Sequence, residues 1–288
     1  MELELQSMDI LERIHASYYQ LTATERKVAD FVLVHHAQVQ FMSITQLADE
    51  CGTADATISR FCKSLQLKGF NAFKLELAKH TATSTAADLE KQKTMDSETL
   101  EGRCREVGRL NQEAVSQTIE LVNYDAVVKA VDFFEKAGKV ISMGAGGSMI
   151  MADEFAHLFS TVSGKFFSVA DAHLQMSAAA TMNPGDVLVL LSYSGATTNG
   201  LQVLELAKAR GVHTVLVTRY PKSPAAKLAD VVLLCGSNES PVQQGSVRAQ
   251  IAQMVVMDVL YHEYYHRNQE ACEQQLQNIA AALTGMHI

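Results

Sequence analysis

Several marks of other protein classes are missing from this sequence of 288 residues. Its five cysteines, at positions 51, 62, 104, 235 and 272, form no C-x-x-C pair, which argues against a disulfide framework or a cysteine-rich zinc site. No apolar run approaches the roughly 20 residues of a membrane helix, and the acidic N-terminus lacks the basic-then-apolar order of a secretory signal. We therefore expect a protein of the reducing cytoplasm that does not associate with a membrane.

An excess of positive charge is missing overall but present in one segment. The net charge of −8 gives no general reason to expect nucleic-acid binding, and the 48% content of hydrophobic residues predicts a substantial core. Residues 1–55 carry three Lys or Arg against nine Asp or Glu, whereas residues 56–82 carry five against one. Positive charge that begins at this point would face DNA phosphates if a recognition helix begins there too.

The pattern along the chain predicts two domains of different type. Residues 1–80 carry short amphipathic helical patterns, residues 81–103 are small and polar and then charged, as in a linker, and residues 104–288 alternate strand and helix patterns. Long helical stretches at 101–136 and 246–283 would flank a fold of class α/β, a doubly wound parallel sheet of five strands. The predicted strands are Lys139–Met143, Lys165–Val169, Asp186–Leu191, His213–Thr218 and Asp230–Cys235.

Residues 44–63 carry the spacing of a helix-turn-helix, in an N-terminal domain expected to be all-α. Ala48 is small where two helices must approach closely, and Gly52 follows where the turn needs a positive φ. Ile58 and Phe61 would then pack on Leu47. This phase leaves one face of the second helix outward, made of Ala54, Asp55, Ala56, Ser59, Arg60 and Lys63.

The outward face of that helix predicts DNA contacts. Arg60 is the first candidate, because a guanidinium can bridge O6 and N7 of guanine. Thr57 and Ser59 are placed to reach a phosphate or a base edge. The expected phosphate contacts are Lys63, Lys68 and Lys74. A packed helical bundle without a DNA-binding role fits the same helical pattern, but the local charge favours DNA.

A second candidate site follows the predicted strand Asp186–Leu191. The strand leads through Ser192-Tyr-Ser-Gly-Ala-Thr-Thr198 directly into a helical pattern. Hydroxyls and free backbone N–H groups at the carboxyl end of a strand, facing a helix N-terminus, form a cradle for phosphate. The alternative is an ordinary strand-to-helix turn whose hydroxyls only cap the helix.

Two other motifs have alternative interpretations. In Gly144-Ala-Gly-Gly-Ser148 the third glycine of a dinucleotide fingerprint would fall on Met149, so we favour a sugar-phosphate site that joins Ser148 to the Ser192–Thr198 turn. His262-Glu-Tyr-Tyr-His266 matches the H-E-x-x-H of zinc proteases, yet it also fits the end of a long helix. We predict no metal site.

These motifs together resemble a known family. Gly144-Ala-Gly-Gly-Ser148, Ser192-Tyr-Ser-Gly-Ala-Thr197 and Thr218 resemble the sugar isomerase (SIS) fold. Ala56-Thr-Ile-Ser-Arg-Phe61 and Gly69-Phe-Asn-Ala-Phe-Lys74 resemble the DNA-binding segment of the RpiR-type bacterial transcriptional regulators. With both parts present, the chain is similar to that family nearly from end to end.

The resemblance implies a regulator that binds a symmetric operator in double-stranded DNA as a homodimer or homotetramer. Its SIS domain would sense a phosphosugar and control sugar-metabolism genes, without catalytic residues or a cofactor. The residues implied to hold the phosphate are Ser148, Ser192, Ser194 and Thr197, with backbone N–H groups from Tyr193 and Gly195. Glu239 would contact sugar hydroxyls or an amine, unless it is a solvated loop acid. The alternative function is a sugar-phosphate isomerase, which leaves residues 1–80 unexplained.

Overall fold

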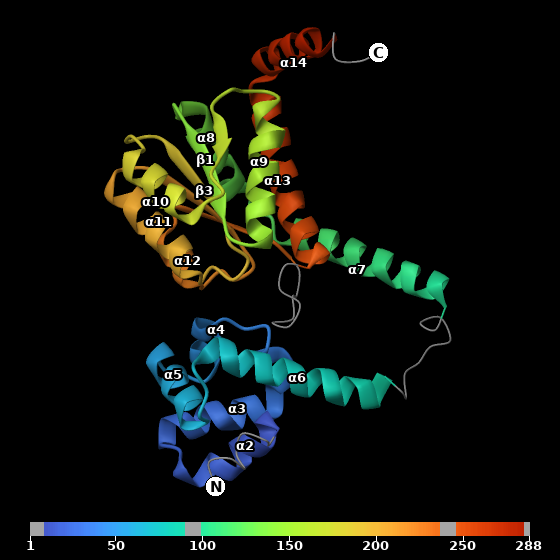
Figure 1. Cartoon of the computed structure of the whole chain (residues 1–288), viewed down its shortest axis with the longest axis vertical. Coiled ribbons are helices and arrows are strands. Elements are labelled where there is room, and N and C mark those ends of the chain that lie inside the picture. The colour runs from blue at the N-terminus through green and yellow to red at the C-terminus, as the bar shows by residue number, and fades with distance from the viewer. Residues whose placement is uncertain (1–8, 90–98, 237–245, 285–288) are drawn as a thin grey trace. The chain divides into compact units, whose positions relative to one another are not determined.

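The computed structural model describes residues 9–89, 99–236 and 246–284. Within these ranges the chain forms two compact units, an N-terminal unit that ends at Leu110 and a C-terminal unit that begins at Asn111 (Figure 1). In the described part of the chain, no helix combines the length and the apolar content needed to cross a bilayer.

The N-terminal domain is a bundle of helices around one apolar core. Val28 and Val32 lie in this core with Leu47, Ile58 and Phe61, and each is 0% exposed. The elements in chain order are α2 (Ile10–Ser17), the 3-10 helix η1 (Tyr18–Gln20), α3 (Ala23–Val39), α4 (Ile44–Glu50), α5 (Asp55–Ser64) and α6 (Phe70–Leu89).

Three of these helices begin with the same local device. The chain places Asp, Thr or Ser before α2, α3 and α4 and a Glu or Gln at the third helical position, so that each end satisfies its own free N–H groups in a capping box. The cap residues are Asp9, Thr22 and Ser43. The sequence therefore determines where each of these helices begins.

The predicted linker is partly helical. Helix α6 continues past position 80 to Leu89, and α7 (Leu100–Glu120) begins before position 103. Alanine and other small side chains do not oppose a helix, so the change of composition at position 81 marks no helix end. The two predicted helical stretches at 101–136 and 246–283 are each divided in two, because α8 (Tyr124–Lys136) has its own Asn123 cap and α13 (Val247–Arg267) ends at Asn268.

The C-terminal domain contains the predicted parallel sheet. Its strands are β1 (Val140–Gly144), β2 (Phe166–Ser168), β3 (Val187–Leu191), β4 (His213–Thr218) and β5 (Val231–Leu234). All neighbouring pairs are parallel, and the order across the sheet is β2-β1-β3-β4-β5. This confirms the predicted fold class and the existence of each predicted strand.

Helices cover both faces of the sheet, as Figure 1 shows. Along β3, Val187, Val189 and Leu191 pack into a core with α8, α9 (Gly147–Ser160) and α13. Leu188 and Leu190 point the other way, into a core with α10 (Ala172–Thr181) and α11 (Thr198–Ala209). Helix α12 (Pro224–Leu228) joins that second face. A strand buried on both faces is apolar at every position, which is why this run was recognisable.

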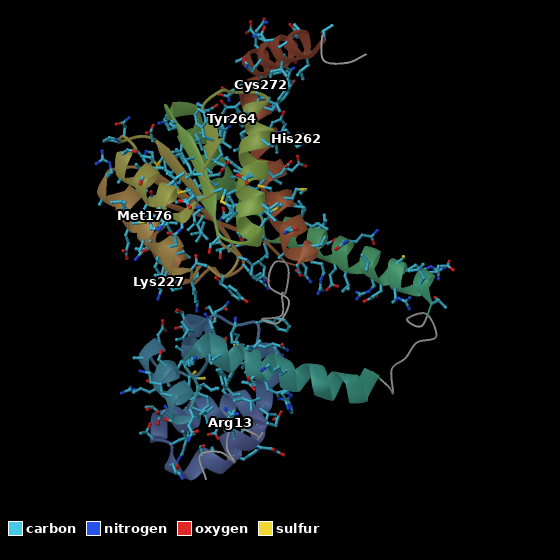
Figure 2. The ribbon with its side chains drawn as sticks, in the orientation of Figure 1. Arg13, Met176, Lys227, His262, Tyr264 and Cys272 are labelled. Carbon is cyan, nitrogen blue, oxygen red and sulfur yellow. The ribbon has the colours of Figure 1, made fainter. Side chains whose placement is uncertain are left out.

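An aromatic cluster fills the core between β2 and the helices α8, α9 and α13. The Phe159 ring lies 4.5 Å from that of Phe155 and 4.6 Å from that of Phe166, measured between centroids. Phe134 and Tyr264, the latter labelled in Figure 2, contact Phe159 edge-on at 5.8 Å. Rings in such contacts add to the stabilisation from burial.

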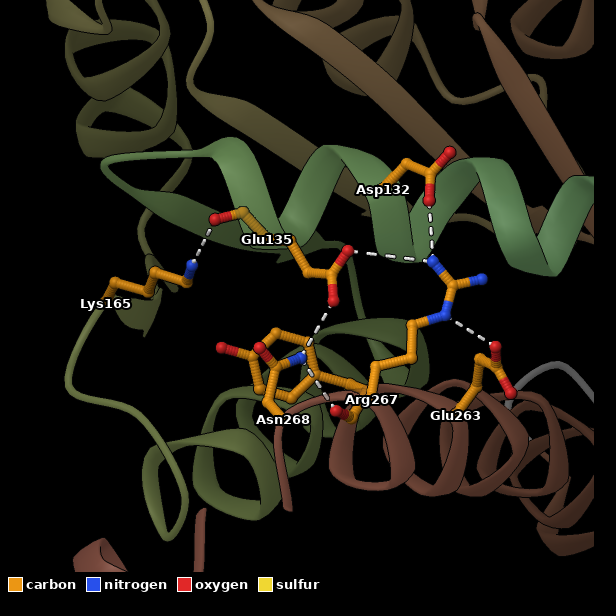
Figure 3. Close-up of polar contacts among 7 residues, drawn as sticks. Asp132, Glu135, Lys165, Glu263, Arg267 and Asn268 are labelled. Carbon is orange, nitrogen blue, oxygen red and sulfur yellow. Dashed lines mark hydrogen bonds and ion pairs between the residues drawn. The ribbon is translucent and has the colours of Figure 1, made fainter. Parts of the chain in front are cut away.

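A polar cluster at the C-terminal end of α13 fixes this helix to α8 (Figure 3). Arg267 donates from Nη1 to Asp132 at 2.6 Å and from Nε to Glu263 at 2.6 Å. The Asn268 side chain donates to Glu135 at 3.0 Å. The glutamate of the His262-Glu-Tyr-Tyr-His266 motif is thus an arginine partner within a helix, which favours the structural interpretation of that motif.

Neighbouring residues of β2 provide a matched test of the aromatic core. Phe166 is 3% exposed and Phe167 is 49% exposed. Phe166→Ala should lower the free energy of unfolding of the C-terminal domain by about 3–5 kcal/mol, because it removes a ring and leaves a cavity. Phe167→Ala should stay within about 0.5 kcal/mol. Calorimetry of the full chain measures both, and equal effects would contradict the assigned core.

Candidate functional sites

The crevice expected for a ligand lies where the order of the strands reverses. Strands β1 and β3 are neighbours, with Gly144 paired to Leu191, but the chain continues from β1 to one edge of the sheet and from β3 to the other. Ligands bind at such switch points, outside the carboxyl ends of the strands. The structure therefore brings the turn that ends at Ser148 and the turn that starts at Ser192 to adjacent positions on one edge.

The turn after β3 is tightly hydrogen-bonded. The Gly195 N–H donates to the Ser192 carbonyl at 3.0 Å, and the Gly195 carbonyl accepts from Ala225 N at 2.9 Å. The Ser194 hydroxyl accepts from Ala196 N at 3.3 Å. In this conformation the Gly195 N–H is therefore occupied within the turn, which corrects the expectation that it is available to a ligand.

Gly195 also sets the shape of this turn. Its φ of +60° is left-handed, and a Cβ at this position would overlap the Ser223 hydroxyl and lie 3.1 Å from Oγ1 of Thr218. Thr218, which is 0% exposed, donates this hydroxyl to the Tyr193 carbonyl at 3.0 Å. Glycine is required here for both conformation and space.

The N-terminus of α11 lacks the cap that its sequence would allow. Thr197 is the N-cap residue, yet its side chain makes no capping hydrogen bond, whereas Asp171 and Ser246 cap α10 and α13. The first intrahelical bond runs from Leu201 N to the Thr197 carbonyl, so the three preceding N–H groups have no partner within the helix. The interpretation of this turn as a simple helix cap does not fit Thr197.

Ser148 lies in the first turn of α9, which begins after Gly146 without a side-chain cap. Its hydroxyl accepts from Nε2 of Gln253 at 3.3 Å, and Gln253 comes from α13 and is 2% exposed. The sequence pattern did not identify Gln253, because a single glutamine in a long helix usually lies on its solvated face.

A second buried glutamine was also missed. Gln175 of α10 is 1% exposed and contacts the carbonyls of Gly144 and Val169, while Asn199 of α11 contacts its Oε1. These contacts connect the ends of β1 and β2 with the N-terminus of α11. A glutamine after several exposed residues carries no sequence signal of such a role.

The remaining ligand candidates differ in their exposure to solvent. Ser192 is 4% exposed, Tyr193 and Ser194 are half-buried, and Thr197 is exposed. Glu239 lies outside the described residues. Among the residues that the structure describes, no group of three or more His, Cys, Asp or Glu side chains could hold a metal ion.

The helix-turn-helix has the predicted geometry. Gly52, in the turn between α4 and α5, has a φ of +60°, and Ala48 is 1% exposed at the contact of the two helices. Ile58 and Phe61 are buried in the same core as Leu47. The phase of α5 is therefore the one expected from the sequence.

Four of the six DNA-contact candidates lie where DNA could reach them. Arg60, Lys63 and Lys68 are exposed, and Ser59 is half-buried. Thr57 differs from the expectation: it is 5% exposed, and its hydroxyl accepts from Nη2 of Arg60 at 3.4 Å. It is thus placed to orient Arg60 and not to face DNA itself.

Lys74 also departs from its expected role as a phosphate contact. Its side chain is half-buried, and its Nζ donates to the Met42 carbonyl at 3.1 Å. Burial lowers the pKa of this amine to about 8. Lys74 therefore fastens α6 to the segment that precedes the helix-turn-helix. Its partner, Met42, lies in the loop between α3 and α4, and the helical period of α6 gives no sign of this contact.

Two part-buried side-chain hydrogen bonds hold the ends of α5. At its start, Thr45 of α4 donates to Asp55 at 3.0 Å, and at its end Ser64 donates to Glu25 of α3 at 3.1 Å. Burial of Glu25 raises the pKa of its carboxyl. Hydrogen bonds from Thr22 and Ser64 and the charge of Arg60 lower it by more, so the pKa lies below the ordinary value of 4.5. The exposed face of α5 is therefore held in a fixed orientation.

Comparison with known proteins identifies the family of both domains. A family model for the helix-turn-helix domain of the rpiR family matches residues 8–84, and the SIS domain model matches residues 133–263. An HTH-type transcriptional regulator of Caldanaerobacter subterraneus is 30% identical over 276 residues, which cover 96% of this chain and 97% of that protein. The chain belongs to the RpiR family of transcriptional regulators. Another HTH-type transcriptional regulator, YbbH of Bacillus subtilis, is 26% identical over 276 residues, which cover 96% of this chain and 97% of that protein.

Solved structures show the same fold. The Vibrio vulnificus NanR protein, determined in complex with ManNAc-6P, is 23% identical and superposes with a TM-score of 0.85 over 97% of this chain and 100% of its own. The sugar isomerase domain of an RpiR transcription factor from Sphaerobacter thermophilus is 22% identical, with a TM-score of 0.56 over 61% of this chain and 97% of its own. At these identities the likeness concerns the fold of this RpiR-family chain.

The glycine in the β3 turn can be tested by substitution. Gly195→Ala should lower the free energy of unfolding by at least about 1–2 kcal/mol, because it adds left-handed strain and a clash with Ser223. Gly164→Ala is the matched control, since a Cβ there meets nothing within 4 Å and its φ is not positive. Urea unfolding followed by circular dichroism measures both, and an unchanged Gly195→Ala variant would contradict the described turn.

The contacts of Glu25 predict a pH-dependent stability. Because the folded pKa is lowered from 4.5, the carboxylate stabilises the N-terminal domain above about pH 4.5, and this contribution is lost as the pH falls through the folded pKa. Glu25→Gln should therefore be less stable than the natural chain at pH 7, and the difference should shrink as the pH falls below 4.5. Thermal unfolding from pH 3 to pH 7 measures the difference, with the exposed Glu50→Gln as control. A difference that is constant with pH would contradict the assigned contacts.

Proposed function

We propose that this regulator binds a phosphosugar in the crevice between the β1 and β3 turns and that binding changes its affinity for an operator. The observation that carries the proposal is the pair of uncapped helix N-termini, α9 and α11, at the switch point of the sheet. At α11 the first three N–H groups have no partner in the helix, whereas at α9 the Ser148 and Met149 N–H groups donate to the Ala145 and Gly146 carbonyls. An anion is stabilised by unpaired N–H groups, here mainly those of α11, and by the dipoles of both helices.

The phosphate is assigned to the hydroxyls around these two termini. Ser148 accepts its hydrogen bond from Gln253, which leaves the proton of its own hydroxyl to donate to a phosphate oxygen. Ser192, Ser194 and Thr197 surround the other terminus. The NanR structure, a complex with ManNAc-6P, supports an amino-sugar phosphate as the first compound to try.

The DNA interface is assigned to the exposed face of α5. Arg60 reads a base edge or a phosphate, and Ser59, Lys63 and Lys68 contact the DNA backbone. We infer that the protein acts in the cytoplasm. We also infer that it is a homodimer or homotetramer, because two such helices about 34 Å apart fit successive major grooves of a two-fold-symmetric operator. A ligand that changes this spacing changes the affinity for DNA.

We propose further that the site binds its sugar without converting it. An aldose–ketose isomerase needs a base beside C1 and C2 of the sugar. Asp171, at the start of α10, is already the cap of that helix, since it accepts from Leu174 N at 2.9 Å. Exchange of solvent deuterium into a panel of sugar phosphates tests this point by NMR: binding without exchange is expected, and turnover would establish the isomerase instead.

Arg60 tests the DNA interface. Duplexes that the natural protein selects from a random pool serve as probes. Arg60→Ala should weaken their binding by at least about tenfold, because one base or phosphate contact is lost, and should leave sugar-phosphate binding unchanged. Lys27→Ala, an exposed cation on α3, is the matched control. Equal DNA binding by Arg60→Ala and the natural chain would remove Arg60 from the interface.

Ser194 tests the ligand site independently. Ser194→Ala should weaken the binding of the sugar phosphate and abolish its effect on DNA, while DNA affinity without ligand stays the same. Ser177→Ala, an exposed hydroxyl on α10, is the control. Calorimetric titration and fluorescence anisotropy measure the two affinities. A normal ligand response in Ser194→Ala would place the phosphate elsewhere.

A further inference from the structure

Gln175 is a buried polar side chain among groups that all belong to the proposed crevice. Its Nε2 lies 2.9 Å from the Gly144 carbonyl, at the end of β1, and 2.9 Å from the Val169 carbonyl, beyond the end of β2. An amide nitrogen carries two protons, and carbonyl oxygens can only accept. Both protons of Gln175 are therefore used, one on each turn.

The orientation of this amide determines the next contact. If the Gln175 amide were reversed, its oxygen would face two carbonyl oxygens, so Oε1 must be the atom that faces Asn199. Asn199 must then donate, and its Nδ2 lies 2.6 Å from Oε1. Asn199 is the second residue of α11, inside the helix turn whose N–H groups have no helical partner. A chain of hydrogen bonds with one fixed direction thus runs from α11 through α10 to β1 and β2.

We propose that Gln175 is a positioning residue of the phosphosugar site, which fixes the N-terminus of α11 relative to the β1 turn through Asn199. The inference rests on the proposed function, because the two elements matter only if one ligand contacts both. Groups that converge on a single phosphate must be held within about 0.5 Å of their productive positions. Pairing within the sheet fixes the ends of β1 and β3. The hydrogen bonds from Asn199 through Gln175 to Gly144 and Val169, here called the Gln175 relay, fix the residues beyond these ends.

A double-mutant cycle tests the relay. Gln175→Met keeps the length of the side chain and removes its amide hydrogen bonds, including those to Gly144, Val169 and Asn199. Asn199→Ala removes the side chain that donates to Gln175. Each should weaken binding of ManNAc-6P, or of the panel compound that the natural chain binds best, by about tenfold. The double variant should be little weaker than either single one, because both changes break the same relay. Gln202→Met, an exposed glutamine on α11, should bind as the natural chain does.

A pH profile separates this role from a purely structural one. Gln175→Glu has the same shape, but its carboxylate would face two carbonyl oxygens, whereas its protonated form regains one donor. Its affinity relative to the natural chain should therefore recover as the pH falls from 8 to 5.5. The affinity of Gln175→Met relative to the natural chain should not change with pH. Because each affinity is divided by that of the natural chain at the same pH, the titration of the phosphate itself cancels.

The outcomes separate the inference from the function on which it rests. If the natural chain binds no compound of the panel and no inorganic phosphate, the proposed function is wrong and the relay has no role in it. If the natural chain binds and the effects of Gln175→Met and Asn199→Ala simply add, with a flat profile for Gln175→Glu, Gln175 is not a positioning residue. Should Gln175→Met fail to fold, Asn199→Ala, at a half-buried position, and the profile of Gln175→Glu still decide the question.

Discussion

The parallel pairing of β1 with β3 is the constraint on which the proposed ligand site depends. These strands are adjacent in the sheet although β2 lies between them in the chain, and their crossovers leave toward opposite edges. Because no crossover covers the point between them, two helix N-termini can open toward one crevice. The apolar strands, packed on both faces, hold this geometry, and the turn residues supply only the groups that meet a ligand.

Buried polar side chains extend that rigid frame into the two sites. Gln175 and Gln253 connect helices to the turns of the crevice, and Glu25 and Thr45 fix the two ends of the recognition helix. Each of these four side chains is itself buried and would be costly to leave unpaired. The exposed candidate residues Arg60 and Thr197 therefore lie on helices whose positions are fixed by these buried hydrogen-bonding side chains.

Much of this architecture could be predicted from the sequence, for definable reasons. Strands buried on both faces give continuous apolar runs, so β4 was predicted at the bounds that the structure shows, and the helix-turn-helix was recognisable from Ala48 and Gly52. The roles of Thr57, Lys74 and Gln175 could not be predicted, because their partners lie on other elements and a polar residue in a helix carries no sign of which neighbour it meets. The Gly195 N–H was misassigned for a similar reason, since the turn's own hydrogen bonding decides its direction.

The proposed link between ligand binding and DNA binding is tested most directly through thermodynamic reciprocity. The affinity for the sugar phosphate is measured by calorimetry with and without a saturating operator duplex, and the affinity for the duplex is measured with and without saturating sugar phosphate. If the two binding events are linked, both affinities change by the same factor, and this factor differs from one. Tight binding of both ligands with no mutual effect would contradict the proposed link.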